Sequence, residues 1–383
     1  MLTVAGVIEK ARRSTGLHDL GEESYRDGLE VVVKAANSDS RLNDLGWAML
    51  EGKIVMLLSN RLKIEHWYAK HPEIDEQEII APLIGLGLPR TGSTALVCNL
   101  AEDPGMRSLR MWESYSPCPP PETATESQDP RIEQMRALMT QVDELYPRMK
   151  MMVPFSPTVI AEDLNLMGLD FKTPDLQTAG RFPDYAEWLL HKADLVPTYR
   201  YMKRALKLLQ WRCPRNRWQL KSPTHLPFID ALNETFPDAK FWMTHRDITK
   251  VMPSLVDVYH EMLKPVMAEV DAKYIIDVNM TFYTTGMQRT LAFRDKGHED
   301  RFIDVQFSEF QRDPESSIAR IYEFLGEEFT PEARRKMADW RRHSAKDKHG
   351  TNRYDAIASS LDLNEVRSRF QFYTDRFVQE TTS

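Results

Sequence analysis

Cysteine, glycine and long apolar runs are all scarce in this chain of 383 residues. The three cysteines, Cys98, Cys118 and Cys213, form no CxxC pair, which excludes a disulfide framework and a zinc ribbon. So few cysteines are typical of a reducing compartment, and we expect a cytoplasmic protein. No apolar run approaches the roughly 18 residues of a membrane span. Residues 1–16 do not follow the pattern of a signal peptide.

An excess of positive charge is also absent. Fifty Lys and Arg residues stand against 57 Asp and Glu residues, which gives a formal net charge of −7. A dedicated nucleic-acid binder would usually be basic, so we expect no nucleic-acid partner, although a local basic pocket for a small anion is compatible with this balance. The hydrophobic content of 42% is ordinary for a globular protein and is enough for a sizeable core.

The pattern of apolar residues divides the chain at Ile79. Residues 1–78 read as helices, with apolar side chains that recur every four residues between 50 and 62. From residue 79 the run IIAPLIGLGL predicts a buried strand, and further strands are predicted at 218–220, 239–244 and 301–307, with helices between them. We therefore expect an α/β, P-loop-like fold in three layers, with a central parallel sheet flanked by helices. A helix-rich N-terminal region (1–78) would pack on the α/β domain (79–383), which carries a helical insert at about 122–212.

Ligands of such sheets bind at the carboxyl ends of the strands, where this chain places Arg90, Lys221 and Arg246. The segment from Gly87 to Thr94 has the glycine spacing of a P-loop, whose backbone N–H groups and following helix suit an anion. Serine stands where the P-loop lysine belongs, which counts against an ATPase or kinase. An ordinary strand–turn–helix with a capping hydroxyl is the alternative.

Two of these segments resemble the phosphate motifs of sulfotransferases that use 3′-phosphoadenosine 5′-phosphosulfate (PAPS), particularly bacterial members related to the protein-tyrosine sulfotransferases. One motif is the loop PRTGST, and the other is a strand that ends in arginine with a serine eight positions later. The resemblance implies a 5′-phosphosulfate loop, an arginine and a serine on the 3′-phosphate, an adenine-contacting aromatic, and a late contact to the 3′-phosphate. The implied cofactor-binding residues are Pro89, Arg90, Thr91, Gly92, Ser93, Thr94, Arg246, Ser254, Phe307, Lys348 and Gly350.

The same resemblance implies that Arg90 and Lys221 hold the leaving oxygen and the sulfuryl group, without a metal. The acceptor hydroxyl needs a general base, and two residues compete for that role. Glu113 lies where the glutamate-using branch of the family places its catalytic carboxylate, and we favour it because that branch also has arginine in the loop. His225, in the segment THLP, resembles the catalytic histidine of the cytosolic sulfotransferases.

The sequence thus predicts a sulfotransferase that moves a sulfuryl group from PAPS to a hydroxyl and releases adenosine 3′,5′-bisphosphate. The Met-rich stretch 149–153 suggests an apolar acceptor pocket, and hence a lipid, a glycolipid or another bulky alcohol. A P-loop-type kinase and a catalytically inactive nucleotide-binding scaffold remain alternatives. The oligomeric state is not predicted.

Overall fold

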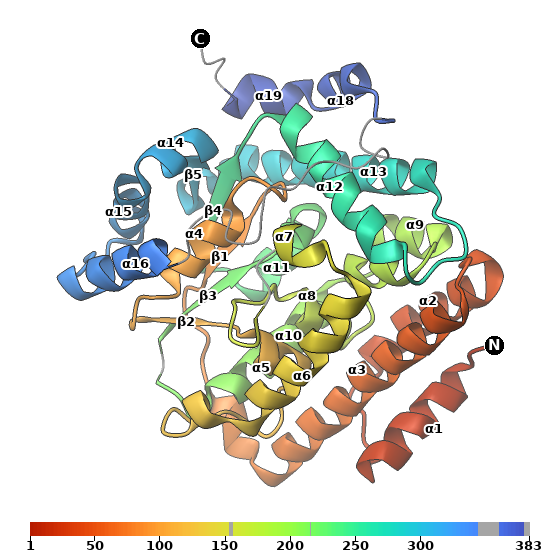
Figure 1. The fold of residues 1–383 in the computed structure, drawn as a ribbon. Helices are drawn as coiled ribbons and strands as arrows, with labels where there is room; N and C mark the ends of the chain where they lie inside the picture. The colour runs from red at the N-terminus through yellow and green to blue at the C-terminus, as the bar shows by residue number, and fades with distance from the viewer. Residues whose placement is uncertain (153–155, 215, 344–359, 379–383) are drawn as a thin grey trace.

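The computed structural model describes residues 1–152, 156–214, 216–343 and 360–378. The chain opens with three helices, α1 (Val4–Thr15), α2 (Arg26–Asp39) and α3 (Asp44–Lys70), which lie together along one side of the molecule (Figure 1). The side chains of α3 at the predicted four-residue spacing, from Leu50 to Leu62, are almost fully buried. One apolar cluster includes these side chains and residues of the sheet such as Phe241, so the N-terminal helices pack on the α/β core.

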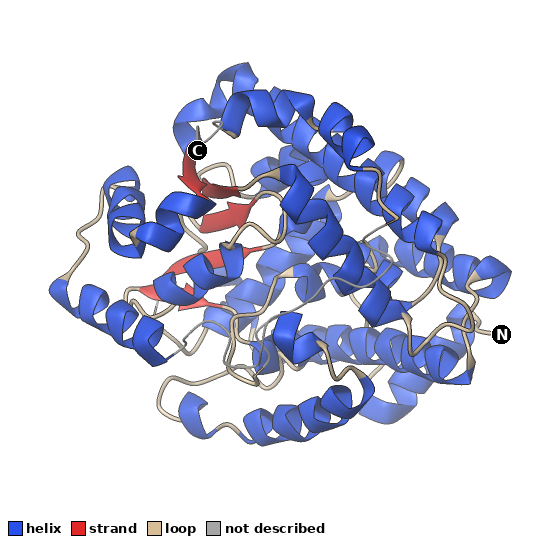
Figure 2. Ribbon diagram, turned by 45° about the horizontal axis from the view of Figure 1, so that its top comes forward, coloured by secondary structure: helices blue, strands red, loops and turns tan. Residues whose placement is uncertain are grey.

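A parallel sheet of five strands lies within a shell of helices (Figure 2). Its strands occur in the order β2-β3-β1-β4-β5, with β1 at the centre. This arrangement confirms the predicted α/β fold. The strands are β1 (Leu83–Leu86), β2 (Met106–Ser108), β3 (Arg217–Lys221), β4 (Lys240–His245) and β5 (Phe302–Gln306).

Strand β1 begins four residues later than the apolar run predicts. Ala81 has a φ of 40°, in the left-handed region, and Pro82 has no N–H to donate to a ladder. The run therefore becomes regular strand only at Leu83. Strand β2 was not predicted, because its three residues at the edge of the sheet are too short to produce an alternating pattern.

Helices cover both faces of the sheet and fill the predicted insert. After β1 come α4 (Ser93–Leu100) and α5 (Met111–Tyr115), and the insert contains α6 (Pro130–Leu145), α7 (Met149–Met152), α8 (Leu164–Gly168), α9 (Pro183–His191) and α10 (Val196–Gln210). Glu122 and Arg212, at the predicted ends of the insert, are bridged and form an ion pair. The helices that follow β3 and precede the C-terminal pair are α11 (Ile229–Thr235), α12 (Ile248–Leu263), α13 (Ala272–Phe293), α14 (Phe307–Arg312), α15 (Pro314–Leu325) and α16 (Pro331–His343).

Two short C-terminal helices, α18 (Leu363–Arg369) and α19 (Gln371–Phe377), pack beside the carboxyl ends of β4 and β5 (Figure 1). The phenol oxygen of Tyr373 accepts a hydrogen bond from the backbone N–H of Arg246 at 3.2 Å. The ring of Phe377 stacks on His245 at 4.1 Å. The last helix therefore supports the end of β4 directly. Within the described ranges, no helix is both long and apolar enough to cross a membrane.

A buried ionic cluster lies under α19. Asp304 on β5 accepts hydrogen bonds from Arg294 at 2.7 and 2.9 Å and bonds the Nε2 atom of His245 at 2.8 Å. Burial opposes the ionisation of Asp304, but the hydrogen bonds from Arg294 and His245 outweigh it and hold the pKa of this carboxyl well below its usual value. Burial also lowers the pKa of His245. The cluster therefore stabilises the fold with an ionised carboxylate.

Candidate active site

The loop between β1 and α4 is shaped by three residues with positive φ, Gly87 with φ of 124°, Arg90 with φ of 63° and Gly92 with φ of 88°. The hydroxyl of Thr91 donates to the carbonyl of Leu88 at 2.7 Å and lies 2.6 Å from the hydroxyl of Thr244, which ties the loop to β4. The backbone conformation at Gly92 favours glycine. A Cβ there would also lie 2.7 Å from the ring of Phe307.

Four of the predicted donor-binding residues meet around this loop. The Nε atom of Arg90 donates to the hydroxyl of Ser254 on α12 at 2.9 Å. Arg246, at the end of β4, donates from Nη1 to the carbonyl of Arg90 at 3.0 Å. Its guanidinium lies 4.4 Å from the centre of the Phe307 ring. The structure thus brings together two cationic groups, a hydroxyl and an aromatic ring from four separate segments, and guanidinium and hydroxyl groups are typical partners of phosphate.

The loop's other predicted residues surround the start of α4. Ser93 and Thr94 are the first residues of this helix and are half-buried, as Pro89 is. They carry the first backbone N–H groups of the helix, where an anion is favoured. The predicted Lys348 and Gly350 lie outside the described residues. Helix α12 runs from Ile248 to Leu263 and includes Pro253, directly before Ser254.

Lys221 lies on the other side of the loop from Arg246, because β1 pairs with β3 on one side and with β4 on the other. The N–H of Ser222 donates to the carbonyl of Gly85 at 3.0 Å, which fixes the end of β3 against β1. Polar groups at the carboxyl ends of three adjacent parallel strands therefore frame one site.

A carboxylate that the sequence did not reveal bonds this lysine. Glu162, in the insert just before α8, forms an ion pair with the Nζ atom of Lys221. It also accepts from the hydroxyl of Ser222 at 3.4 Å. The Glu162 side chain is 32% exposed and that of Lys221 only 6%. Glu162 is thus a partly accessible carboxylate next to a buried cation. No motif marks it, since it lies far from Lys221 in the chain.

His225 is completely buried and both of its ring nitrogens have partners. Nδ1 lies 2.9 Å from the phenol oxygen of Tyr199, and Nε2 lies 2.9 Å from Oδ2 of Asp163. A base role for His225 stays a prediction, and it would require one of these hydrogen bonds to open.

Glu113 is also completely buried. It forms an ion pair with Arg107 on β2 and accepts from the backbone N–H of Arg110 at 2.9 Å, as part of the capping box of α5. It is among the residues around a cavity of about 870 Å³ beside β2, whose lining includes neither Arg90 nor Lys221. These contacts do not bring Glu113 to the loop, and its role as base stays a prediction.

The Met-rich part of the insert reaches the loop. The carbonyl of Met152 at the end of α7 accepts from Nη1 of Arg90 at 2.9 Å. The side chains of Met149 and Met152 pack on Val258 of α12. Arg148 pairs with Glu261 of the same helix at 2.8 Å. The insert therefore places an apolar surface beside Arg90.

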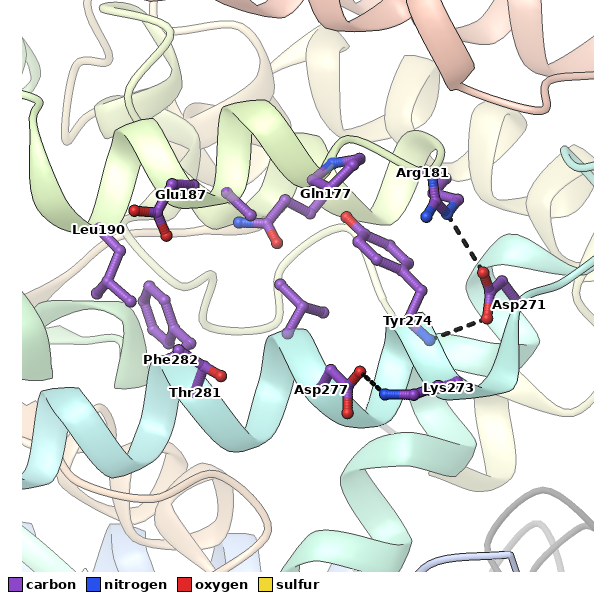
Figure 3. Close-up of a pocket in the computed structure, with 13 residues that line it drawn as sticks. Gln177, Arg181, Glu187, Leu190, Asp271, Lys273, Tyr274, Asp277, Thr281 and Phe282 are labelled. Atoms are coloured by element: carbon purple, nitrogen blue, oxygen red, sulfur yellow. Dashed lines mark hydrogen bonds and ion pairs between the residues drawn. The ribbon is translucent and has the colours of Figure 1, made fainter.

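A separate cavity of about 450 Å³ lies between α9 and α13 (Figure 3). Its apolar floor includes Phe282, and the charged residues at its edge pair with one another, Arg181 with Asp271 and Lys273 with Asp277. None of the predicted site residues that the structure describes lines it. It is distinct from the phosphate loop.

The geometry defines an α/β protein whose β1–α4 loop lacks the P-loop lysine and is surrounded by arginine side chains and a hydroxyl, groups that suit an anionic ligand. Comparison with known proteins gives the family. Residues 82–331 match the model of the sulfotransferase family, and the chain belongs to that family.

Two solved structures are similar over nearly the whole chain. Sulfotransferase STF9 from Mycobacterium avium is 30% identical, with a TM-score of 0.91, over 99% of this chain and 98% of that one. Sulfotransferase STF1 from Mycobacterium tuberculosis H37Rv is 28% identical, with a TM-score of 0.85, over 96% and 98% of the two chains. These likenesses confirm the predicted family resemblance and fold.

A curated relative matches over a shorter stretch. Omega-hydroxy-beta-dihydromenaquinone-9 sulfotransferase Stf3 of Mycobacterium bovis is 31% identical over 134 residues, and the same protein of Mycobacterium tuberculosis matches equally. This stretch is 31% of the present chain and 32% of the relative, so the match spans about a third of the curated protein.

Proposed function

We propose that this protein transfers the sulfuryl group of PAPS to a hydroxyl on a bulky, largely apolar acceptor. The observation that carries the proposal is the meeting of Arg90, Arg246, Ser254 and Phe307 around a loop that lacks the P-loop lysine. A 3′-phosphate suits the guanidinium of Arg246 and the hydroxyl of Ser254, and an adenine ring suits the face of Phe307. The 5′-phosphosulfate would then lie at the N-terminus of α4.

In sulfuryl transfer the acceptor oxygen forms a bond to sulfur while the bond from sulfur to the 5′-phosphate oxygen breaks. Negative charge develops on the leaving phosphate, and the cationic groups of Arg90 and Lys221 on this side of the sheet stabilise it. The protein's main contribution is to hold donor and acceptor in line and to supply this fixed charge.

The acceptor proton needs a base, and among the described carboxylates we propose Glu162. It is partly exposed, whereas Glu113 and His225 are completely buried. Its ion pair with Lys221, the cation that we propose for the sulfuryl group, supports this choice. Glu162 would take the proton from the hydroxyl as the oxygen attacks sulfur.

The proposed apolar acceptor follows from the walls of the site. Met149 and Met152 pack beside Arg90, and methionine adapts to irregular apolar partners. The name of the curated relative Stf3 indicates an acceptor with a hydroxyl at the end of a menaquinone derivative. That chemistry fits the same description, a terminal hydroxyl on a large apolar molecule.

Ligand-dependent thermal unfolding tests the donor class. Adenosine 3′,5′-bisphosphate at ~100 times its dissociation constant should add about 2.7 kcal/mol to the free energy of unfolding. ATP at the same concentration should add little, because its phosphates extend from the 5′ position only. A shift with ATP and none with the bisphosphate would favour a kinase. Turnover of labelled PAPS with an apolar alcohol then distinguishes an enzyme from an inactive scaffold.

A further inference from the structure

Three polar side chains form a continuous hydrogen-bonded chain inside the protein, behind the proposed base. Tyr199 of α10, His225 after β3, and Asp163 before α8 are each completely buried. The phenol oxygen of Tyr199 lies 2.9 Å from Nδ1 of His225, and Nε2 of His225 lies 2.9 Å from Oδ2 of Asp163. The three groups come from separate segments, so the fold has to assemble them.

One arrangement of protons satisfies every contact in this chain. Burial raises the pKa of Tyr199 well above its ordinary value, so its hydroxyl keeps the proton and can donate it to Nδ1. Nε2 then carries the imidazole proton and donates it to the carboxylate of Asp163. Both ring nitrogens of His225 are engaged in this arrangement, so neither has a lone pair left for an acceptor hydroxyl.

The arrangement is not one that stability alone would favour. The second carboxylate oxygen of Asp163, Oδ1, is buried and has no hydrogen-bond partner among the described residues. An unsatisfied buried acceptor carries a desolvation cost, and well-packed apolar residues in place of buried polar groups are often at least as stable. Asp163 also precedes the first turn of α8 but does not cap it with its side chain. Its carboxylate points to His225 instead.

Asp163 follows directly after Glu162, and both carboxylates bond side chains of the segment 221–225, which follows β3. Glu162 bonds Lys221 and Ser222 at the start of that segment. Asp163 bonds His225, four residues after Lys221 in the sequence. The backbone that carries Glu162 is thereby anchored on its inner side, while the Glu162 side chain faces the site.

We propose that Tyr199, His225 and Asp163 form a positioning chain that fixes the carboxylate of Glu162 against Lys221. His225 is then a positioning residue and does not exchange a proton with the acceptor. The inference rests on the proposed function for its catalytic meaning. The structural part of the inference, that His225 holds the segment around Glu162 in place, depends only on the observed hydrogen bonds.

The test compares His225→Leu with His225→Gln. Leucine removes both hydrogen bonds, and the resulting displacement of Glu162 should lower kcat about 10- to 100-fold. Glutamine can still donate to Asp163 and should restore most of kcat, although it cannot act as a base. In both variants the KM for PAPS and the dissociation constant of the bisphosphate should stay within twofold of the wild type. Equal inactivity of the two variants would overturn the proposal.

The split between kcat and KM is the readout that a merely structural role would not give. Displacement of Glu162 should lower kcat alone, whereas a general loosening of the fold would also raise the KM for PAPS. A parallel rise of this KM in His225→Leu would contradict the proposal.

Tyr185→Phe is the matched control, because Tyr185 is an equally buried phenol whose partners are the backbone of Phe171 and Thr173. It should leave kcat and the KM for PAPS within twofold of the wild type. Hydrogen–deuterium exchange gives a readout without turnover: exchange of the peptides spanning 157–167 should rise in His225→Leu and stay at the wild-type level in Tyr185→Phe. If the wild type does not use PAPS, the proposed function fails, but the exchange experiment still tests the positioning role of His225. Unchanged exchange in His225→Leu would refute that positioning role.

Discussion

Replacing Arg246 by alanine tests the proposed donor site most directly, because this side chain contacts both the phosphate loop and Phe307. In the structure it bonds the carbonyl of Arg90 at 3.0 Å and lies 4.4 Å from the centre of the Phe307 ring. In the proposed complex it also pairs with the 3′-phosphate. Loss of one member of a charged, hydrogen-bonded pair costs roughly 2–5 kcal/mol in binding. The dissociation constant of the bisphosphate should therefore rise about 30- to 4,000-fold.

Isothermal titration calorimetry with two ligands makes the result specific. Adenosine 5′-monophosphate lacks the 3′-phosphate, so the wild type should bind it much more weakly than the bisphosphate, and Arg246→Ala should bind the two with similar affinity. Arg246→Lys keeps the charge but loses the planar guanidinium, and it should fall between. An unchanged affinity for the bisphosphate in Arg246→Ala, or an equal loss for both nucleotides, would refute the assignment of Arg246 to the 3′-phosphate.

Three further predictions follow from the site and the core. Gly92→Val should abolish binding of the bisphosphate in calorimetry while the far-ultraviolet circular dichroism stays native, because only the left-handed loop is disturbed; retained affinity would mean that the loop is a simple turn. Glu162→Gln should lower kcat ~10²- to 10⁴-fold with little change in bisphosphate affinity, whereas Glu113→Gln should mainly lower the free energy of unfolding, since it breaks a buried ion pair; the opposite result would return the base to Glu113. Asp304→Asn should lower the free energy of unfolding at pH 7, because the depressed pKa of this carboxyl stabilises the fold above the unfolded value of ~3.9. The wild type should lose that contribution as the pH falls below about 4, whereas the variant has none to lose. Urea unfolding across pH measures the difference, and parallel curves for both proteins would exclude this role.

The meeting of Arg90, Arg246 and Ser254 could be predicted from the sequence, because these residues lie at fixed short distances from strand ends. Arg90 follows β1 within one loop, and Ser254 follows Arg246 on the next helix, so local geometry nearly determines where they meet. The same logic predicted four of the five strands. Strand β2 was missed because three residues at an edge carry no pattern.

The acceptor side could not be predicted in this way. Glu162 reaches Lys221 only because the insert folds back on the sheet, and nothing in the residues around it marks that return. The segment THLP marked His225 as a candidate base, but it did not indicate that the side chain is buried. Its complete burial, with both nitrogens engaged, depends on Tyr199 and Asp163, which come from other parts of the fold.

The bond between Tyr373 and the backbone of Arg246 has a consequence for how the protein is made. Tyr373 lies 127 residues after Arg246, so both phosphate motifs leave the ribosome well before α19 is made. The backbone at the end of β4 gains this support only when that helix docks. We therefore expect the proposed nucleotide site to become rigid only after α19 is synthesised, and a product that ends before this helix would carry both motifs without that support.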